Sequence, residues 1–161
     1  MTTQTTTQPP KFYLTKEGLK KVQKEYDKLL EFRSLKMKGE VPSILHSEDV
    51  NPDYLTFQED MNLLESRIAE CENILKNVEL IQTPKEEKNM VWLGATVTLE
   101  EVPDGTINEY TLLGTLEANP AEGKISSESP VGRSLLGKRI GEEVVISSPI
   151  RVVYKVKKII Y

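Results

Sequence analysis

Apolar residues in the second quarter of the chain recur in alternating steps of three and four, and this spacing constrains the fold most strongly. The series comprises Tyr54, Phe57, Met61, Leu64, Ile68, Cys71, Leu75 and Val78. Such steps place all these side chains on one narrow face of an α-helix. Asn51 is suited to cap the helix, Pro52 to its first position and Asp53 to the positive end of its dipole. A helix with so narrow an apolar face needs a partner.

The partner is predicted immediately upstream. Thr15 is suited to cap a helix whose matching apolar stripe comprises Leu19, Val22, Tyr26 and Leu29. Two successive helices with narrow apolar faces are expected to pack as an antiparallel coiled-coil hairpin over residues 11–81. Gly39 and Pro42 disfavour a continuous first helix, so the tip is expected at about 39–51. The return arm, at ~1.5 Å per residue, would be roughly 45 Å long.

The pattern changes after Ile81. Residues 82–90 are polar and predict a linker, and residues 91–161 predict a small antiparallel β domain, which makes the fold class α+β. Pro103-Asp104-Gly105 predicts a turn, and a short helix is expected from Pro130 to Leu136, capped by Ser129 and ended by Gly137. The predicted strands are Val91–Val102, Ile107–Leu116, Val144–Ile146 and Val152–Ile159.

Composition indicates a cytoplasmic protein. Residues 1–10 have the polar composition of a disordered tail and lack the apolar core of a signal peptide. No apolar run approaches the ~20 residues that span a membrane, so no membrane association is expected. The single cysteine, Cys71, cannot form an internal disulfide, as is typical of a reducing compartment, and its place in the apolar series predicts a small core residue.

The net charge of −4 hides an asymmetry between the two predicted arms. Residues 11–38 contain nine Lys/Arg and four Asp/Glu, a net charge of +5, whereas residues 39–81 contain two and ten, a net charge of −8. One interpretation is mutual attraction of the two helices across their seam. The other is an acidic tip that faces a metal ion and a basic flank that faces nucleic acid.

Four segments resemble the GreA/GreB family of bacterial transcript-cleavage factors. LTKEGLKKVQKEYDKL from Leu14 is similar to the opening of the family's first arm, and LLESRIAECENILKNVELI from Leu63 to its return arm. WLGATVTLEEV from Trp92 is similar to the first strand of its C-terminal domain, and SPVGRSLLGKRIGEEV from Ser129 to a later segment of that domain. The four follow one another in the family's order and cover nearly all of the chain after the tail.

The resemblance implies both a fold and a mechanism. In this family an FK506-binding-protein-like C-terminal domain docks at the rim of the secondary channel of RNA polymerase, and the coiled coil enters the channel. Carboxylates at the tip then help to hold a second Mg²⁺ shared with the polymerase and orient water for hydrolysis of backtracked nascent RNA. The resemblance therefore implies a monomeric elongation factor that is not itself an enzyme.

The tip departs from the family pattern Asp-Leu-x-Glu-Asn-x-Glu-Tyr. Alignment on Asn51, Asp53 and Tyr54 places the two metal-associated acids at Ser47 and Val50, which cannot bind a cation through carboxylates. An alignment of the first arm without gaps places them at Asp49 and Pro52 instead. The connection between the arms is therefore about two residues shorter than the pattern.

Glu48 and Asp49 are the candidate site residues, because they lie between the two displaced positions. In one hypothesis they bind the shared Mg²⁺ and assist cleavage. In a second hypothesis the protein enters the channel but does not stimulate cleavage, and acts as a regulator or competitor. In a third, both acids are ordinary solvated loop residues. His46 beside them is expected to be polar surface.

Candidate nucleic-acid contacts lie on the basic flank. Arg33, Lys36 and Lys38 are placed to follow RNA phosphates, although surface lysines and arginines equally serve solubility. Tyr54 and Phe57 are expected to pack in the seam, with stacking of Tyr54 on a base as the alternative.

Two function classes compete with this interpretation. A prolyl isomerase is suggested by the FK506-binding-protein-like fold, but the aromatic residues Trp92, Tyr110, Tyr154 and Tyr161 are scattered without an obvious pocket signature. A coiled-coil chaperone or scaffold would explain the heptads, but it would not explain the ordered C-terminal motifs.

Overall fold

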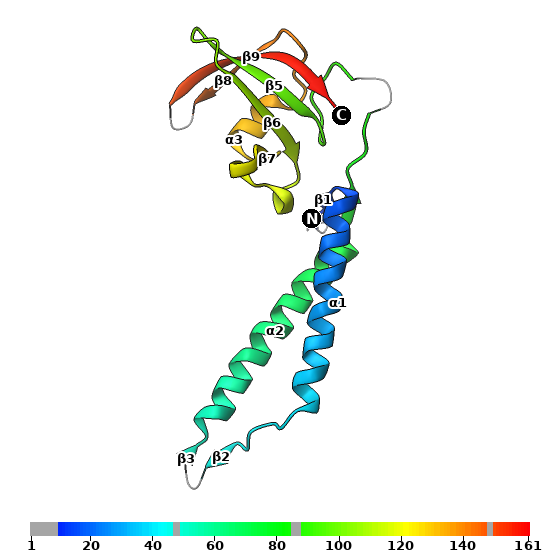
Figure 1. Ribbon diagram of the computed structural model, residues 1–161, viewed down its shortest axis with the longest axis vertical. Coiled ribbons are helices and arrows are strands. Elements are labelled where there is room, and N and C mark those ends of the chain that lie inside the picture. Colours follow the sequence, from blue (N-terminus) through cyan, green and yellow to red (C-terminus); the bar gives the residue numbers. More distant parts are fainter. Residues whose placement is uncertain (1–9, 47–48, 85–87, 148–149) are drawn as a thin grey trace, which may run out of the picture. The chain divides into compact units, whose positions relative to one another are not determined.

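The computed structural model describes residues 10–46, 49–84, 88–147 and 150–161. It divides into two compact units (Figure 1). The helical unit is Leu19–Asn77, and the β unit combines the N-terminal segment up to Gly18 with Val78–Tyr161. Within the described ranges, no helix has the length and apolarity needed to cross a membrane.

Two long helices, α1 (Lys16–Lys38) and α2 (Pro52–Lys76), run antiparallel and confirm the predicted hairpin (Figure 1). Both helices begin at the predicted caps. The Thr15 hydroxyl accepts a hydrogen bond from the Gly18 amide at 3.0 Å, and the Asn51 side chain accepts one from the Asp53 amide at 3.0 Å. These bonds satisfy amides that have no partner within the first turn of a helix.

The predicted seam is correct over most of its length and wrong at its C-terminal end. Leu64, Ile68 and Cys71 are buried, as expected, but the next buried residue is Ile74, whereas Leu75 is only half-buried. Ile74 follows Cys71 by three residues, whereas the predicted repeat continued with a step of four to Leu75, and both steps reach the neighbouring turn of the helix. Val78 is not helical at all, because α2 ends at Lys76.

A two-stranded parallel sheet joins the beginning and the end of the hairpin sequence. Strand β1 (Phe12–Leu14) pairs with β4 (Val78–Leu80), with Phe12 opposite Val78 and Leu14 opposite Leu80. Leu14 is only 1% exposed. These strands belong to the β unit, so the boundary between the units lies at Gly18 and Val78, inside the 11–81 range predicted for the hairpin.

The β unit is a curled five-stranded sheet with the order β7-β6-β5-β9-β8 (Figure 1). All neighbouring strands are antiparallel except β6 and β7, which are parallel. The strands are β5 (Thr96–Val102), β6 (Ile107–Leu113), β7 (Lys124–Ser126), β8 (Glu143–Ser147) and β9 (Arg151–Ile160), with 3₁₀ turns η1 (Thr115–Glu117) and η2 (Pro120–Glu122) between β6 and β7.

One short helix packs on this sheet and completes the core. Helix α3 (Pro130–Leu135) begins at Ser129, whose hydroxyl accepts a hydrogen bond from the Gly132 amide at 3.0 Å, as predicted. Leu135 from α3 is fully buried with the inward residues of the strands. The core cluster comprises Val91, Ala95, Val97, Leu99, Leu112, Ile125, Leu135, Val144, Ile146 and Val156.

The predicted strands exist, but their limits differ. The first begins at Thr96 instead of Val91, because residues 92–95 form a turn in which the Ala95 amide donates to the Trp92 carbonyl at 3.1 Å. The second ends at Leu113 instead of Leu116. Strand β7 was not predicted, since three residues give too little alternation to recognise.

Candidate functional site

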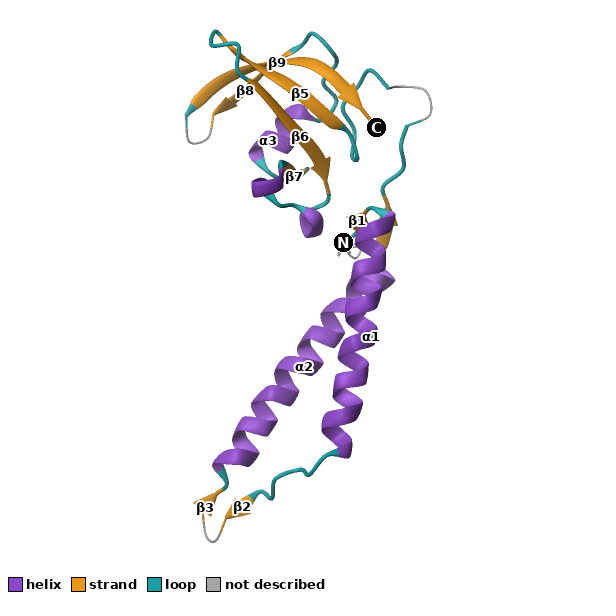
Figure 2. Ribbon diagram, viewed as in Figure 1, coloured by secondary structure: helices purple, strands orange, loops and turns teal. Residues whose placement is uncertain are grey.

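The connection at the tip, residues 39–51, is partly a small β-hairpin (Figure 2). Strand β2 (Leu45–His46) pairs antiparallel with β3 (Asp49–Val50), with Leu45 opposite Val50 and His46 opposite Asp49. A turn was predicted here, and the two strands were not. Two residues per strand are too few to show a period.

Asn51 joins this hairpin to the start of α2. Its side-chain oxygen caps the helix at Asp53, and its side-chain amide donates to the Ser43 carbonyl at 2.9 Å. Its backbone amide donates to the Ile44 carbonyl at 3.0 Å. One residue therefore ties together the incoming strand of the tip and the first turn of α2.

The candidate acids are partly outside the described structure. Glu48 lies outside the described residues, and Asp49 lies in β3, where its backbone pairs with His46. Within 10–46, 49–84, 88–147 and 150–161, no group of three or more His, Cys, Asp or Glu side chains is arranged to hold a metal ion.

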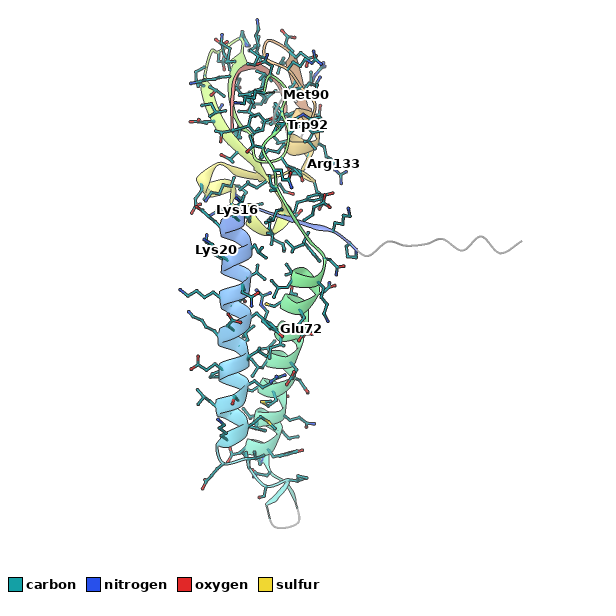
Figure 3. The ribbon with its side chains drawn as sticks, turned by 90° about the vertical axis from the view of Figure 1, so that its right-hand side faces the viewer. Lys16, Lys20, Glu72, Met90, Trp92 and Arg133 are labelled. Atoms are coloured by element: carbon teal, nitrogen blue, oxygen red, sulfur yellow. The ribbon has the colours of Figure 1, made fainter. Side chains whose placement is uncertain are left out.

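Charged side chains bridge α1 and α2 along the seam. In the three ion pairs, residue numbers increase along α1 from Glu25 to Lys36 while those of their partners decrease along α2 from Arg67 to Asp60, as in an antiparallel pair. Glu72, labelled in Figure 3, accepts a hydrogen bond from the Tyr26 hydroxyl at 2.9 Å. The ion pairs are Arg67 with Glu25 at 2.7 Å, Arg33 with Glu65 at 3.3 Å and Lys36 with Asp60 at 2.6 Å. Two of these three ion pairs join a basic residue of α1 to an acidic residue of α2, as the net charges of the two arms predict, whereas the pair of Glu25 with Arg67 has the reverse polarity.

Two of the three predicted RNA contacts take part in these bridges. The Lys36 ammonium also lies 5.8 Å from the ring centroids of both Phe32 and Phe57. Arg33 and Lys36 continue the α1 stripe by steps of four and three from Leu29, so they occupy seam positions. Lys38, at the end of α1, is exposed.

Hydrogen bonding and burial shift the pKa values of three groups in the helical unit. The hydrogen bonds of Arg67 to Glu25 and Glu70 raise its pKa further above its ordinary value. The hydrogen bond to Glu72 raises the pKa of Tyr26, because it favours the protonated phenol. Burial raises the pKa of the Cys71 thiol, which is 1% exposed, so this thiol is not an activated nucleophile.

A contact between distant residues of the β unit was not visible in the sequence. The Glu117 carboxylate accepts hydrogen bonds from the Thr15 amide at 2.7 Å and from the Thr15 hydroxyl at 2.6 Å. A carboxylate is well placed there, because the N-terminus of a helix carries partial positive charge. The two residues are 102 positions apart, so no local pattern could have paired them.

The aromatic residues of the β unit have mainly structural roles. Tyr110 and Tyr154 pack against the core, and the Tyr161 hydroxyl donates to the Met90 carbonyl and accepts from the Trp92 amide at 3.0 Å. Trp92, labelled in Figure 3, is 43% exposed and lines a pocket with Tyr13. Tyr110, Tyr154 and Tyr161 do not line this pocket.

Comparison with known proteins decides the family. Residues 86–161 match the family described as "Transcription elongation factor, GreA/GreB, C-term". Transcription elongation factor GreA of Shouchella clausii is 39% identical over 141 residues, which cover 86% of this chain and 89% of that protein. The chain belongs to the GreA/GreB family. GreA of Thermomicrobium roseum is 41% identical over 139 residues, with 84% and 88% covered. The GreA factor homolog 1 structure of Thermus thermophilus is 24% identical with a TM-score of 0.43, covering 94% of this chain and all of that one.

The GreA/GreB segments recognised in the sequence correspond to defined elements. Leu14–Leu29 contains the Thr15 cap and the first half of α1, and Leu63–Ile81 contains the buried part of α2 and all of β4. Ser129–Val144 comprises α3 and the turn that leads into β8. In that segment Gly132 lies against β7, and a Cβ there would be 2.0 Å from the Ser126 carbonyl oxygen.

Proposed function

We propose that this GreA/GreB-family elongation factor binds bacterial RNA polymerase through its β unit. Its helical hairpin then enters the secondary channel and promotes cleavage of backtracked nascent RNA. GreA relatives of about 40% identity support the general role. The protein would act as a cytoplasmic monomer that is not itself an enzyme, because the polymerase holds the rest of the active site.

The observation that carries the proposal is the position of the tip hairpin. Helix α2 has 25 residues, so at ~1.5 Å per residue it spans roughly 37 Å. Strands β2 and β3 lie at the end of the two helices that is remote from Leu19 and Asn77 (Figure 2). Asp49 lies in β3 at this end, and Glu48 precedes it in the sequence, so these two residues are the candidate acids.

The donor set fits a shared Mg²⁺. Mg²⁺ keeps several waters and takes one or two carboxylates from a protein. In a two-metal site, such an ion stabilises the attacking and leaving oxygens of a phosphoryl displacement. Glu48 and Asp49 would contribute these carboxylates, and the remaining ligands would come from the polymerase and the RNA.

The seam bridges limit the nucleic-acid part of the proposal. Arg33 and Lys36 are engaged with Glu65 and Asp60, so an RNA phosphate would have to compete with these carboxylates. Lys38 is the stronger candidate for contact with nascent RNA, because it is exposed at the end of α1. Its contribution would fall with added salt, as phosphate contacts do.

Purified polymerase stalled in a backtracked complex tests the proposal. Added wild-type protein is expected to accelerate RNA shortening, and the Glu48→Gln/Asp49→Asn double variant to reduce that acceleration at least about tenfold. Glu40→Gln is the matched control, since Glu40 is an exposed acid at the opposite end of the same connection. RNA shortening that is independent of added protein would contradict the cleavage role.

A second function, polymerase binding without cleavage, is favoured by one feature. When the chain is aligned to the family pattern at Asn51, the family's two acids fall on Ser47 and Val50, which are not acidic. Val50 pairs with Leu45 in the tip hairpin. Competition between this protein and a cleavage-competent factor for the stalled complex distinguishes the two functions. Inhibition without RNA shortening would identify a regulator.

A further inference from the structure

Asn51 contacts both sides of the tip connection, and its two side-chain bonds have different chemistry. The side-chain oxygen accepts from the Asp53 amide in α2, whereas the side-chain nitrogen donates to the Ser43 carbonyl in the incoming segment. The first bond is an ordinary helix cap. The second does nothing for the helix, because Ser43 lies eight residues upstream, before β2.

The same residue extends the β2–β3 ladder. Its backbone amide donates to the Ile44 carbonyl at 3.0 Å, next to the pair formed by Leu45 and Val50. Ser43 and Ile44 are consecutive, so Asn51 holds the incoming segment through one side-chain bond and one backbone bond. The tip hairpin is thus fixed at the residue where α2 begins.

The described part of the connection is irregular where it leaves α1. Helix α1 ends at Lys38, where the Gly39 amide donates to the Leu35 carbonyl at 3.1 Å, and residues 40–43 are neither helix nor strand. On the α2 side, Asn51 attaches the hairpin through its side-chain bond to Ser43 and its backbone bond to Ile44. Asp49 is only two residues from Asn51 along β3, so rotation about Asn51 would displace it.

From these contacts we propose that the Asn51 side-chain amide is a positioning group that orients the tip hairpin on α2, and with it Asp49. The inference rests on the proposed function, since it matters for catalysis only if Asp49 serves the cleavage reaction. Asn51 itself does not touch the reacting atoms. It acts through the direction in which the hairpin leaves the helix.

We call the bond from the Asn51 side-chain amide to the Ser43 carbonyl the strap. Substitutions at position 51 separate this strap from the helix cap. Asn51→Asp and Asn51→Ser both retain an oxygen that can accept from the Asp53 amide, and Asp and Ser are about as good at this position as Asn. The Asp carboxylate has no proton to donate to the Ser43 carbonyl, and the Ser hydroxyl sits on a side chain shorter than the amide group that reaches this carbonyl in wild type. Only the first substitution adds charge. Asn51→Ala removes both bonds.

The first measurement is hydrogen exchange of the backbone amide of residue 51 in the full-length protein, followed by NMR and expressed relative to the intrinsic rate for the residue present. Loss of an exposed hydrogen bond is expected to accelerate its exchange about fivefold in Asn51→Asp and Asn51→Ser, with unchanged helical content. Unchanged exchange in both variants would overturn the strap. This measurement does not depend on the polymerase.

The second measurement is RNA cleavage in the backtracked complex at matched polymerase occupancy. Both variants are expected to fall at least about tenfold below wild type, since small misplacement of a reacting group has large kinetic effects. Faster exchange with wild-type cleavage would overturn the positioning role. If Asn51→Ala alone lost cleavage, the cap would explain it and the proposal would be wrong.

Failure of the proposed function gives a different result. In that case wild-type protein would not accelerate RNA shortening at all, and the positioning role would be wrong together with the function. The exchange measurement would still decide whether Asn51 fixes the tip hairpin.

Discussion

Adjacent leucines on α2 provide a direct test of the seam. Leu64 is 7% exposed, whereas Leu63 is 74% exposed. The same substitution to alanine at both positions changes helix propensity equally, so the difference between the two variants reports packing against α1 alone. Leu63→Ala is therefore the matched control for Leu64→Ala.

The expected magnitude follows from the carbon atoms removed. Leucine to alanine removes three carbons, worth about 2.4 kcal/mol when fully buried at about 0.8 kcal/mol each. Scaled by exposure, the loss is about 2.2 kcal/mol at Leu64 and about 0.6 kcal/mol at Leu63. The better helix propensity of alanine stabilises both variants by about 0.2 kcal/mol, so it cancels from their difference. The free energies of unfolding should therefore differ by about 1.6 kcal/mol.

Urea denaturation followed by circular dichroism at 222 nm measures this difference, since α1 and α2 contain most of the helical residues. With a slope of about 1.5 kcal/mol/M, the midpoints should be about 1 M apart. If Leu64→Ala and Leu63→Ala shifted the midpoint equally, the two helices would not pack through this face.

Two further predictions concern the core of each unit. Gly132→Ala would place a Cβ 2.0 Å from the Ser126 carbonyl oxygen and should lower the free energy of unfolding by about 1–3 kcal/mol. The control is Gly39→Ala, whose Cβ would meet no atom closer than 3.6 Å and which should be nearly neutral. Thermal melts of both variants measure the difference. Burial raises the pKa of the Cys71 thiol, so folding favours the protonated form, and its contribution to stability is present below pH 9 and lost as the pH rises past that value. Urea midpoints between pH 8 and pH 10 should therefore fall more steeply for wild type than for Cys71→Val, and equal slopes would contradict the burial of Cys71.

Local signals in the sequence were sufficient for the helices. Thr15, Asn51 and Ser129 cap as predicted, because a side-chain oxygen next to an apolar period acts within three residues. The GreA/GreB resemblance, carried by four ordered segments, was confirmed by relatives that cover most of the chain. Both the caps and the family segments were recognised from residues that lie near one another in the sequence.

Features that depend on distant residues were missed. The parallel pairing of Phe12–Leu14 with Val78–Leu80 and the bond between Thr15 and Glu117 join segments that no local period relates. The end of α2 was misplaced because Val78 fits the heptad by number, although its backbone pairs with β1. Short strands such as β2, β3 and β7 give no readable alternation.

The candidate site was predictable only in outline. Its place between the helices followed from Gly39 and Pro42, but the strap at Asn51 requires the Ser43 carbonyl to return to the start of α2. The seam positions of Arg33 and Lys36 follow from the α1 stripe, yet their partners Glu65 and Asp60 depend on the register of the two helices. Register is a tertiary property.

The helical unit is an insertion between two neighbouring strands. Because Phe12 lies opposite Val78, the segment between β1 and β4 leaves and re-enters the β unit at adjacent points. Adding or deleting one heptad in both helices would change their length by roughly 10 Å and leave that pair of strands unaltered. The reach of such a protein can therefore change during evolution without any change in its β core.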